Sequence, residues 1–401
     1  KHSHDMKKIL LIMVSLMYVS ITFSQTTLAA GDIAIIQYNS DPNPEIIKFL
    51  AFRSMETGTT INFTDNGWSG SAFRTTEGVH TWTAGSSISC GDVVTVSIPN
   101  GGFNLNASGD QIFAYQGTLA SPSFIFGINV STGNWVDGTP ASRKTALPSA
   151  LTDGTNAVTL THIDNTKYTG SLTGSKTTIL SNICTPGNWT GSNSVVQNFT
   201  GTFISDLTWS GTGSANDYFN LTINASYDTG SNGNFSTCNC TVNVGNTLTI
   251  GSSGSITVEE DIINNGTISV ASSGSVVQIL STGTNSGTDY TVNRTSTSQL
   301  EEGNYTYWSS PLVSSTLADV ADAQKYYSFT ASSQSWGAIS SGTAMSPGKG
   351  YINTGETTIS YPNSYTASFS GSVFNNGNVN TTVSLGTAVF VGADDDWNLL
   401  G

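Results

Sequence analysis

The residue types that carry hydrolytic chemistry are sparse in this chain. After the first five residues the histidines are His80 and His162, and both lie in alternating, strand-like runs. A Ser-His-Asp hydrolase needs a histidine beside its nucleophile, and the sequence has no Gly-x-Ser-x-Gly elbow. Asp65, Glu77 and Asp110 are carboxylates of one segment, whereas a glycosidase requires two such groups held about 5–10 Å apart. We therefore expect no catalytic residues and no enzyme activity.

Metal chemistry is confined to two acidic clusters. Asp41 with Glu45 is the first, and Asp394, Asp395 and Asp396 form the second. Their hard oxygen ligands suit Ca²⁺, but neither cluster has the spacing of an EF-hand or a nonapeptide calcium repeat. Zinc is less suitable, because four cysteines and two histidines at these spacings do not make a compact ligand set. We expect no cofactor, with calcium as a weak alternative and solvated turns as the simpler interpretation.

The four cysteines indicate an oxidising compartment. Cys90 and Cys184 lie in the first large segment, and Cys238 and Cys240 are separated by one residue. A Cys90–Cys184 bridge would close a long loop, and a bridge of that kind stabilises a fold by about 2–4 kcal/mol. We predict this disulfide. A bond between Cys238 and Cys240 would be strained, so we expect each to pack as a small apolar residue.

Two groups of aromatic residues have different expected roles. Sugar faces stack on exposed aromatic rings, so tryptophans near glycine or asparagine are candidate ligand contacts, although a tryptophan in a β-sandwich more often belongs to the core. The candidate contacts are Trp68, Trp82, Trp135 and Trp189. The other group is expected to form an aromatic core near the end of the chain: Tyr305, Tyr307, Trp308, Tyr326, Tyr327, Phe329 and Trp336.

Residues 1–24 have the features of an export leader. Two lysines precede an apolar run from Ile9 to Phe23, which is too short for a membrane-spanning helix. We expect cleavage after Ser24, with Ala30 as the other candidate site. No later segment approaches about 18 uninterrupted apolar residues, so no membrane-spanning segment is expected after the leader. The product is expected to be secreted or displayed on the cell surface.

The composition predicts an all-β protein that avoids polyanions. The chain has 42 glycines in 401 residues, and only 10% of its residues are charged. Helix formers are scarce, whereas β-branched and aromatic residues are plentiful. The net charge of −14 argues against nucleic acid and against anionic membranes as partners. An extracellular glycan or a surface protein is the expected partner class.

Strand and turn patterns divide the chain into several regions. Residues 31–204 contain at least seven short apolar runs separated by turn residues, which predicts a two-sheet, immunoglobulin-like sandwich. Residues 205–240 are poor in aliphatic side chains and are interpreted as a connector that carries a strand or two, with Trp209 and Tyr218–Ile223 as its packed part. Residues 241–282 consist of three- to five-residue strands between Gly- and Asn-rich turns, which favours a short β-solenoid over a meander of hairpins. Residues 283–401 are β-rich again, and because they end inside a strand-like run, we expect this last domain to be truncated.

Two stretches resemble known families. Residues 238–401 contain Cys238-Asn-Cys-Thr-Val, Tyr305-Thr-Tyr-Trp-Ser-Ser-Pro and Met345-Ser-Pro-Gly-Lys-Gly-Tyr, and they resemble large exported surface proteins of Bacteroidetes. The resemblance implies type IX secretion, a route that depends on a sorting domain beyond Gly401. The N-terminal Gly58-Thr-Thr-Ile-Asn-Phe-Thr-Asp-Asn-Gly-Trp run is similar to bacterial lamin-tail-like domains. Those modules are immunoglobulin-like sandwiches, and the similarity brings no catalytic residues.

Taken as a sequence, the chain indicates a secreted or cell-surface, non-catalytic structural or adhesion protein. Modular sandwiches and a short solenoid give rigid reach, and their loops offer contact surfaces. The alternative is a carbohydrate-binding accessory module of a larger secreted hydrolase. Glu259 and Glu260 are expected to be solvated charges near a turn in either case.

Overall fold

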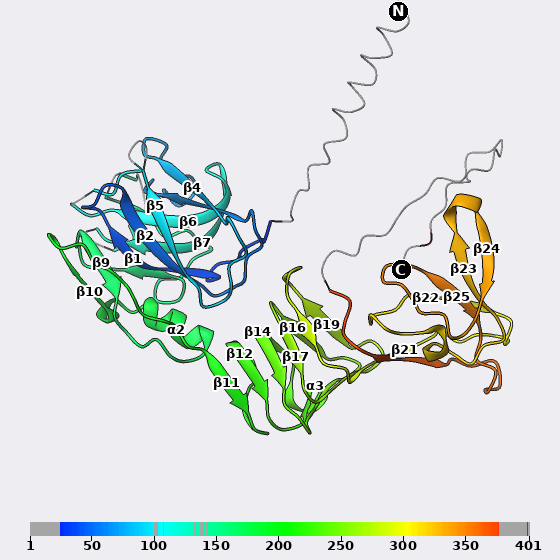
Figure 1. The fold of residues 1–401 in the computed structure, drawn as a ribbon. Coiled ribbons are helices and arrows are strands. Elements are labelled where there is room, and N and C mark those ends of the chain that lie inside the picture. The colour runs from blue at the N-terminus through cyan, green and yellow to red at the C-terminus, as the bar shows by residue number, and fades with distance from the viewer. Residues whose placement is uncertain are drawn as a thin grey trace, which may run out of the picture.

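The fold was analysed in a computed structural model, which describes residues 25–99, 103–106, 108–131, 134–136, 140–141, 143–376 and 399. The fold is all-β, with 43% strand and 6% helix, so the predicted fold class is confirmed. An N-terminal sandwich, a solenoid and a C-terminal domain follow one another along the chain (Figure 1). The predicted leader, residues 1–24, and the acidic cluster at Asp394–Asp396 lie outside the described residues. None of the helices in the described ranges has the length and apolar character that crossing a membrane requires.

The N-terminal region consists of two five-stranded sheets that enclose one apolar core. The first sheet has the strand order β10(Trp189–Ser192)-β9(Asn165–Tyr168)-β1(Ile33–Asn39)-β2(Glu45–Ala51)-β5(Val93–Ile98). The second has the order β4(Val79–Thr83)-β3(Thr60–Thr64)-β6(Gln111–Thr118)-β7(Ser121–Asn129)-β8(Ala157–Thr159). Strands β7 and β8 are parallel, and the other named pairs are antiparallel. Phe49 and Phe63 pack against each other between the sheets, with ring centroids 6.0 Å apart.

A short helix closes one side of the sandwich. Helix α2 (Lys176–Ile183) begins at Ser175, whose side chain accepts a hydrogen bond from the backbone N–H of Thr178. This N-cap satisfies one of the free backbone donors of the first helical turn. Ile179 and Ile183 are fully buried in the sandwich core. The helix is therefore held by its apolar face, because eight residues are too few for a stable isolated helix.

The solenoid begins earlier in the chain than the sequence indicates. Strand β11 (Asp206–Trp209) pairs in parallel with β12 (Tyr218–Ile223), and β12 pairs in parallel with β14 (Phe235–Val242). About four solenoid turns occupy residues 218–292, whereas the prediction was 241–282. The strand expected at Tyr218–Ile223 is therefore present, as β12, and it belongs to the solenoid. Each turn needs only a few inward side chains, so a segment poor in aliphatic residues can still form one.

Two parallel sheets form the body of the solenoid. Strand β12 continues one sheet through β14, β16 (Ser255–Val258), β17 (Ile262–Asn264), β19 (Ser275–Gln278) and β20 (Asn285–Ser286). The other sheet has the order β13(Tyr227–Asp228)-β15(Thr247–Ile250)-β18(Thr267–Val270)-β21(Tyr290–Thr295), and then β26 (Thr366–Gly371). Leu221, Cys240 and Ile262 lie in register on successive turns and are buried. The interior is thus a stack of matched side chains, one layer for each turn.

The C-terminal domain packs on the last turn of the solenoid. Strand β26 pairs with β21 in the antiparallel direction and so ends the parallel stack. A separate four-stranded sheet follows, with the order β22(Tyr305–Trp308)-β25(Tyr351–Thr354)-β23(Tyr326–Thr330)-β24(Ser335–Ile339). The short 3₁₀ helix Leu317–Asp319 begins with a capping box between Thr316 and Asp319. The buried residues of the solenoid and of this domain form one continuous core.

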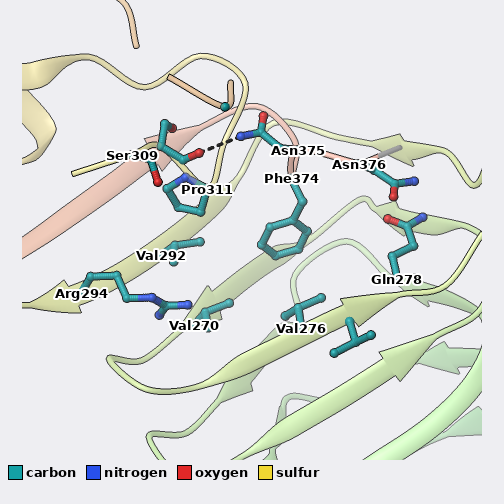
Figure 2. A pocket seen from close by; sticks show the side chains of 13 residues that line it. Val270, Val276, Gln278, Val292, Arg294, Ser309, Pro311, Phe374, Asn375 and Asn376 are labelled. Atoms are coloured by element: carbon teal, nitrogen blue, oxygen red, sulfur yellow. Dashed lines mark hydrogen bonds between the residues drawn. The ribbon is translucent and has the colours of Figure 1, made fainter. Parts of the chain in front are cut away.

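A cavity of about 520 Å³ remains where the solenoid meets the C-terminal domain. Val270, Val276 and Val292 come from the solenoid, and Pro311 and Phe374 come from the C-terminal domain (Figure 2). The ring of Phe374 makes an edge contact with that of Tyr290, at a centroid distance of 4.9 Å. The C-terminal domain therefore does not completely cover the last turn of the solenoid.

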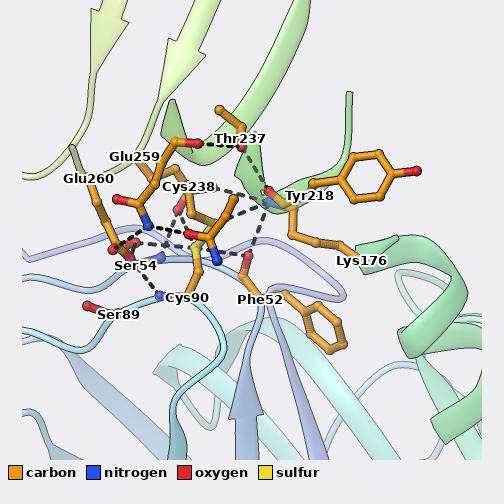
Figure 3. The surroundings of a disulfide bond; sticks show 12 residues. Phe52, Ser54, Ser89, Cys90, Lys176, Tyr218, Thr237, Cys238, Glu259 and Glu260 are labelled. Carbon is orange, nitrogen blue, oxygen red and sulfur yellow. Dashed lines mark hydrogen bonds and ion pairs between the residues drawn. A yellow bond between two sulfur atoms is a disulfide. The ribbon is translucent and has the colours of Figure 1, made fainter. Parts of the chain in front are cut away.

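A disulfide joins the sandwich to the solenoid, and its pairing differs from the prediction. Cys90 is bonded to Cys238, not to Cys184 (Figure 3). Cys184 follows the last residue of α2 and is buried as a free thiol, so the helix holds it in the sandwich core away from Cys90. Cys238 belongs to the sandwich core although its neighbour Cys240 points into the solenoid, where it is free and buried. The expectation that Cys238 packs as an unpaired residue is therefore wrong, and the same expectation for Cys240 is confirmed.

Polar groups surround this disulfide and connect the same two regions. Glu259 accepts a hydrogen bond from the backbone N–H of Ser54 at 2.7 Å and lies 3.5 Å from the ammonium of Lys176. Glu260 accepts from the Ser54 hydroxyl at 2.6 Å and from the Cys90 N–H at 2.7 Å (Figure 3). Both glutamates are buried, so the expectation of solvated charges is wrong. Burial raises the pKa of Glu259, although Lys176 opposes that shift.

Candidate functional site: an exposed aromatic face

Five aromatic side chains lie on one face of the four-stranded C-terminal sheet. Tyr305 and Tyr307 alternate along β22, Tyr327 and Phe329 alternate along β23, and Trp336 lies on β24. Side chains two residues apart in a strand point to the same face of a sheet. We call this set the aromatic face.

The strand register shows that the three strands contribute to the same face. Ile352 of β25 is directly opposite Tyr307 on one side and Tyr327 on the other. Phe329 is directly opposite Trp336. Directly opposed residues of antiparallel strands lie on the same face, so the aromatic face extends across the sheet from β22 to β24.

The rings touch one another and are open to solvent. Tyr305 and Tyr327 are in edge contact, with centroids 6.1 Å apart, and Trp336 lies 5.1 Å from Phe329 and 6.5 Å from Tyr307. Tyr305 is 52% exposed, Tyr307 64% and Trp336 42%. Contiguous exposed apolar surface of this kind usually marks an interaction site.

The opposite face of the same sheet is buried. Tyr326 and Tyr351 are buried, and Trp308 packs against Phe369 at a centroid distance of 6.2 Å. The predicted aromatic core of this region therefore holds for Trp308 and Tyr326, but it is wrong for Tyr305, Tyr307 and Trp336. Strand alternation alone divides these residues, because only one face of the sheet is covered by the rest of the domain.

The aromatic face offers stacking and hydrogen bonding on strands that carry no charged residue of their own. Strands β22, β23, β24 and β25 contain no Asp, Glu, Lys or Arg. Tyrosine and tryptophan rings offer apolar area together with a hydroxyl or an indole N–H at the edge. This chemistry matches a neutral ligand that has both C–H faces and hydroxyl groups.

A comparison with known families assigns the region that contains the aromatic face to one family. Residues 189–401, just over half of the chain, match the model of a family described as a domain of unknown function, DUF8693. The chain belongs to the DUF8693 family. No curated protein and no solved structure matches the chain. The DUF8693 region contains the aromatic face and Cys238, whereas Cys90 precedes it.

The tryptophans predicted as ligand contacts are less open than the aromatic face of the DUF8693 region. Trp68 is 9% exposed and packs edge-on against Phe73 and Phe124, at 5.1 and 5.0 Å. Trp82 and Trp135 are half-buried against neighbouring rings. Trp189 is also half-buried, and its indole N–H donates to the Ile183 carbonyl at 2.7 Å. The sequence signal that finds the exposed set is different: aromatic residues at alternate positions of two strands that carry no charge.

Each residue of the predicted calcium pair has a hydrogen-bond partner within the protein. Asp41 accepts a hydrogen bond from the Asn165 amide, and buried Glu45 accepts from the backbone N–H of Leu105 at 3.0 and 3.1 Å. Across the described residues, one group of three metal-type donors lies within 4.8 Å: Cys90, Cys238 and Glu259. Its two sulfurs are already bonded to each other, so they are not available as thiolate ligands.

Glu45 instead belongs to a set of buried carboxyl groups in the sandwich. Burial raises the pKa of Glu45 to about 7, that of Asp65 to about 6 and that of Asp110 to about 9. Backbone N–H groups of neighbouring loops hydrogen-bond to all three and oppose these shifts. These carboxyl groups favour the protonated form in the fold, so they are pH-sensitive structural groups.

The two histidines have structural neighbours. His80 lies on β4 opposite Phe63, and burial lowers its pKa. His162 lies 3.3 Å from the carboxylate of Asp164. His162 lies in the loop between β8 and β9 and not in a strand, so the expected strand-like run is wrong for His162, whereas His80 is in the strand β4.

Proposed function

We propose that the chain is a non-catalytic adhesion arm of an exported protein and that it contacts neutral glycan through the aromatic face. The observation that carries the proposal is the row of exposed rings at Tyr305, Tyr307 and Trp336. Pyranose rings present C–H faces that stack on such side chains, and their hydroxyl groups match phenol and indole edges. A protein partner is less well supported, because protein interfaces also draw on arginine, which these strands lack.

The long-range electrostatics also favours a neutral ligand. A net charge of −14 repels acidic polysaccharides, nucleic acid and anionic lipid surfaces. The four strands contain no lysine or arginine that would offset this repulsion.

Rigid connections support a role at a distance from an attachment point. The Cys90–Cys238 bond and the contacts of Glu259 and Glu260 fix the sandwich on the solenoid. The solenoid and the C-terminal domain share one core. A ligand bound on the aromatic face would thus be held by a stiff connection to the sandwich, as adhesion requires.

Export is part of the proposal and rests on the residues at the start of the chain. The apolar run from Ile9 to Phe23 and the lysines before it support a leader. A structural disulfide also suits an oxidising compartment.

A glycan array probed with the full chain tests the proposed function. We expect selective binding to neutral glycans, with weaker signals on their sulfated or uronate-containing counterparts. Binding of branched cell-surface glycans would favour the adhesion role. Binding restricted to linear polysaccharides would favour the alternative, an accessory module of a secreted hydrolase. Silence across all glycans would contradict contact through the aromatic face.

A further inference from the structure

The cavity at the end of the solenoid arises from the way a solenoid ends. Interior side chains of the last turn have no following turn to cover them, so a terminal cap is required. In this chain Phe374 and Pro311 cover part of Val270, Val276 and Val292. The remaining 520 Å³ lies within the size range of small-molecule sites, and its lining combines apolar side chains with polar ones.

One cation of the cavity lining, Arg294, has no acidic partner among the described residues. The guanidinium of Arg294 extends along the cavity toward Val270 (Figure 2). Within the described part of the chain, no carboxylate lies within 4.0 Å of it. Desolvation lowers the pKa of Arg294, so its surroundings already disfavour the charge that it carries. An anion in the cavity would relieve that cost.

The hydrogen bonds of Arg294 leave one edge of its guanidinium for a ligand. Nη1 donates to the carbonyls of Ala271 and Asn293 at 3.1 and 2.8 Å, and Nη2 donates to the Gly274 carbonyl at 3.2 Å. These bonds use three of the five N–H donors and hold the group against the Ala271–Gly274 turn. The Nε–H and one Nη2–H remain, and together they form the side-on pair that binds a carboxylate in bidentate fashion.

Other polar groups of the cavity are largely committed to the protein. The Asn375 amide donates to the Ser310 carbonyl at 2.7 Å, and Asn376 donates to the carbonyls of Leu280 and Gly283. Gln278 accepts from Asn285 at 2.8 Å. Asn375 Oδ1 is a buried acceptor without a hydrogen-bond partner, so it adds no donor for an anion. Arg294 is the charged donor of the lining, while Val276 and Phe374 offer apolar contact (Figure 2).

We propose that this cavity binds a small organic monocarboxylate with an apolar body. The carboxylate pairs with the side-on edge of Arg294, and the apolar body packs against Val270, Val276 and Phe374. A polyanion is not the expected ligand, because one guanidinium faces the cavity and the whole chain carries a charge of −14. This site is separate from the aromatic face and does not depend on glycan binding.

Isothermal titration of the full chain with 3-phenylpropionate tests the proposal, with 3-phenylpropionamide as the neutral counterpart. We expect saturable binding of the acid at millimolar concentrations or below, and at least tenfold weaker binding of the amide. Arg294→Gln should remove this preference, and Arg294→Lys should retain only part of it because a lysine has no planar fork. Val244→Ala, an exposed change in a solenoid turn outside the cavity, should bind like the wild type.

A second variant keeps the test decisive if Arg294→Gln fails to fold. Val276→Trp fills the cavity and leaves Arg294 in place, so it should also abolish binding of the acid. No saturable binding to the wild type would overturn the proposal. Equal binding of acid and amide, or binding that survives Val276→Trp in a folded protein, would overturn it as well.

Discussion

The sandwich and the C-terminal sheet both concentrate aromatic side chains, but they expose them very differently. In the sandwich, Trp68 packs with Phe73 and Phe124 in a buried cluster. In the C-terminal sheet, Tyr307 and Trp336 are in contact with one another and open to solvent. The number of aromatic residues in a segment therefore does not indicate whether they stabilise the fold or bind a ligand.

The difference follows from what covers each sheet. Phe113 and Tyr115 of β6 lie on the face of the second sheet opposite to Ile112 and Ala114, which belong to the core between the sheets. Loop residues, among them Trp68 and Phe73, cover that outer face and bury its aromatic side chains. The C-terminal sheet packs on the solenoid with one face only, through Trp308, Tyr326 and Tyr351. The aromatic residues on its other face gain little burial, which leaves binding as the better explanation for them.

The largest expected effect is on stability, and it separates the two aromatic clusters. Trp68→Ala should lower the free energy of unfolding by about 3–5 kcal/mol, because it opens a cavity in a packed cluster. Trp336→Ala should lower it by less than about 1 kcal/mol, because the ring is already exposed. Denaturant unfolding of both variants checks this. Similar losses of stability in the two variants would contradict the distinction between a buried and an exposed aromatic cluster.

The disulfide should matter for the sandwich and not for the aromatic face. Replacing Cys90 and Cys238 with alanine should lower stability by about 2–4 kcal/mol, since the bond closes a loop of 148 residues. Glycan affinity should change by less than about twofold, because the aromatic face lies in another domain. Non-reducing peptide mapping should recover a Cys90–Cys238 peptide. A Cys90–Cys184 peptide would contradict the structure.

The two regions should also respond differently to pH. The raised pKa values of Glu45, Asp65 and Asp110 mean that the folded sandwich retains protons that the unfolded chain releases. Its stability should therefore fall as pH rises from about 4, where the free carboxyl groups titrate, toward 9. Asp110→Asn should remove much of this slope, and glycan affinity should stay level over the same range. Thermal melts from pH 5 to 9 check both points, and a stability that rises over this range would contradict the burial of these acids.

Strand positions could be predicted from the sequence because they depend on local patterns. The strands at Thr60–Thr64 and Val93–Ile98 match runs of β-branched and apolar residues bounded by turn residues. Helix α2 was not predicted, because Lys176–Ile183 contains two threonines and its stability comes from the burial of Ile179 and Ile183. Local propensity does not contain that tertiary contribution.

The sequence indicated that aromatic side chains would be exposed, but it did not indicate which ones. Exposed aromatic residues were expected at Trp68, Trp82, Trp135 and Trp189, whereas the most exposed rings are Tyr305, Tyr307 and Trp336, because exposure depends on which face the rest of the fold covers. The disulfide partner of Cys90 was missed for a related reason. Cys184 is nearer in sequence, but α2 holds it in the core, and the packing of the solenoid brings Cys238 to Cys90.

The smallest change to the fold should have the clearest effect on binding. A Tyr307→Ala/Trp336→Ala double variant removes two exposed rings, each with a stacking contribution of about 0.5–1.5 kcal/mol. Val244→Ala is the matched control, since it truncates an exposed apolar side chain away from the sheet.

The affinity of these proteins for the glycan with the strongest array signal tests the central claim most directly. The account predicts roughly tenfold or greater weakening in the double variant, with an unchanged melting temperature and no loss in the control. Equal affinity of the double variant and the wild type would contradict it.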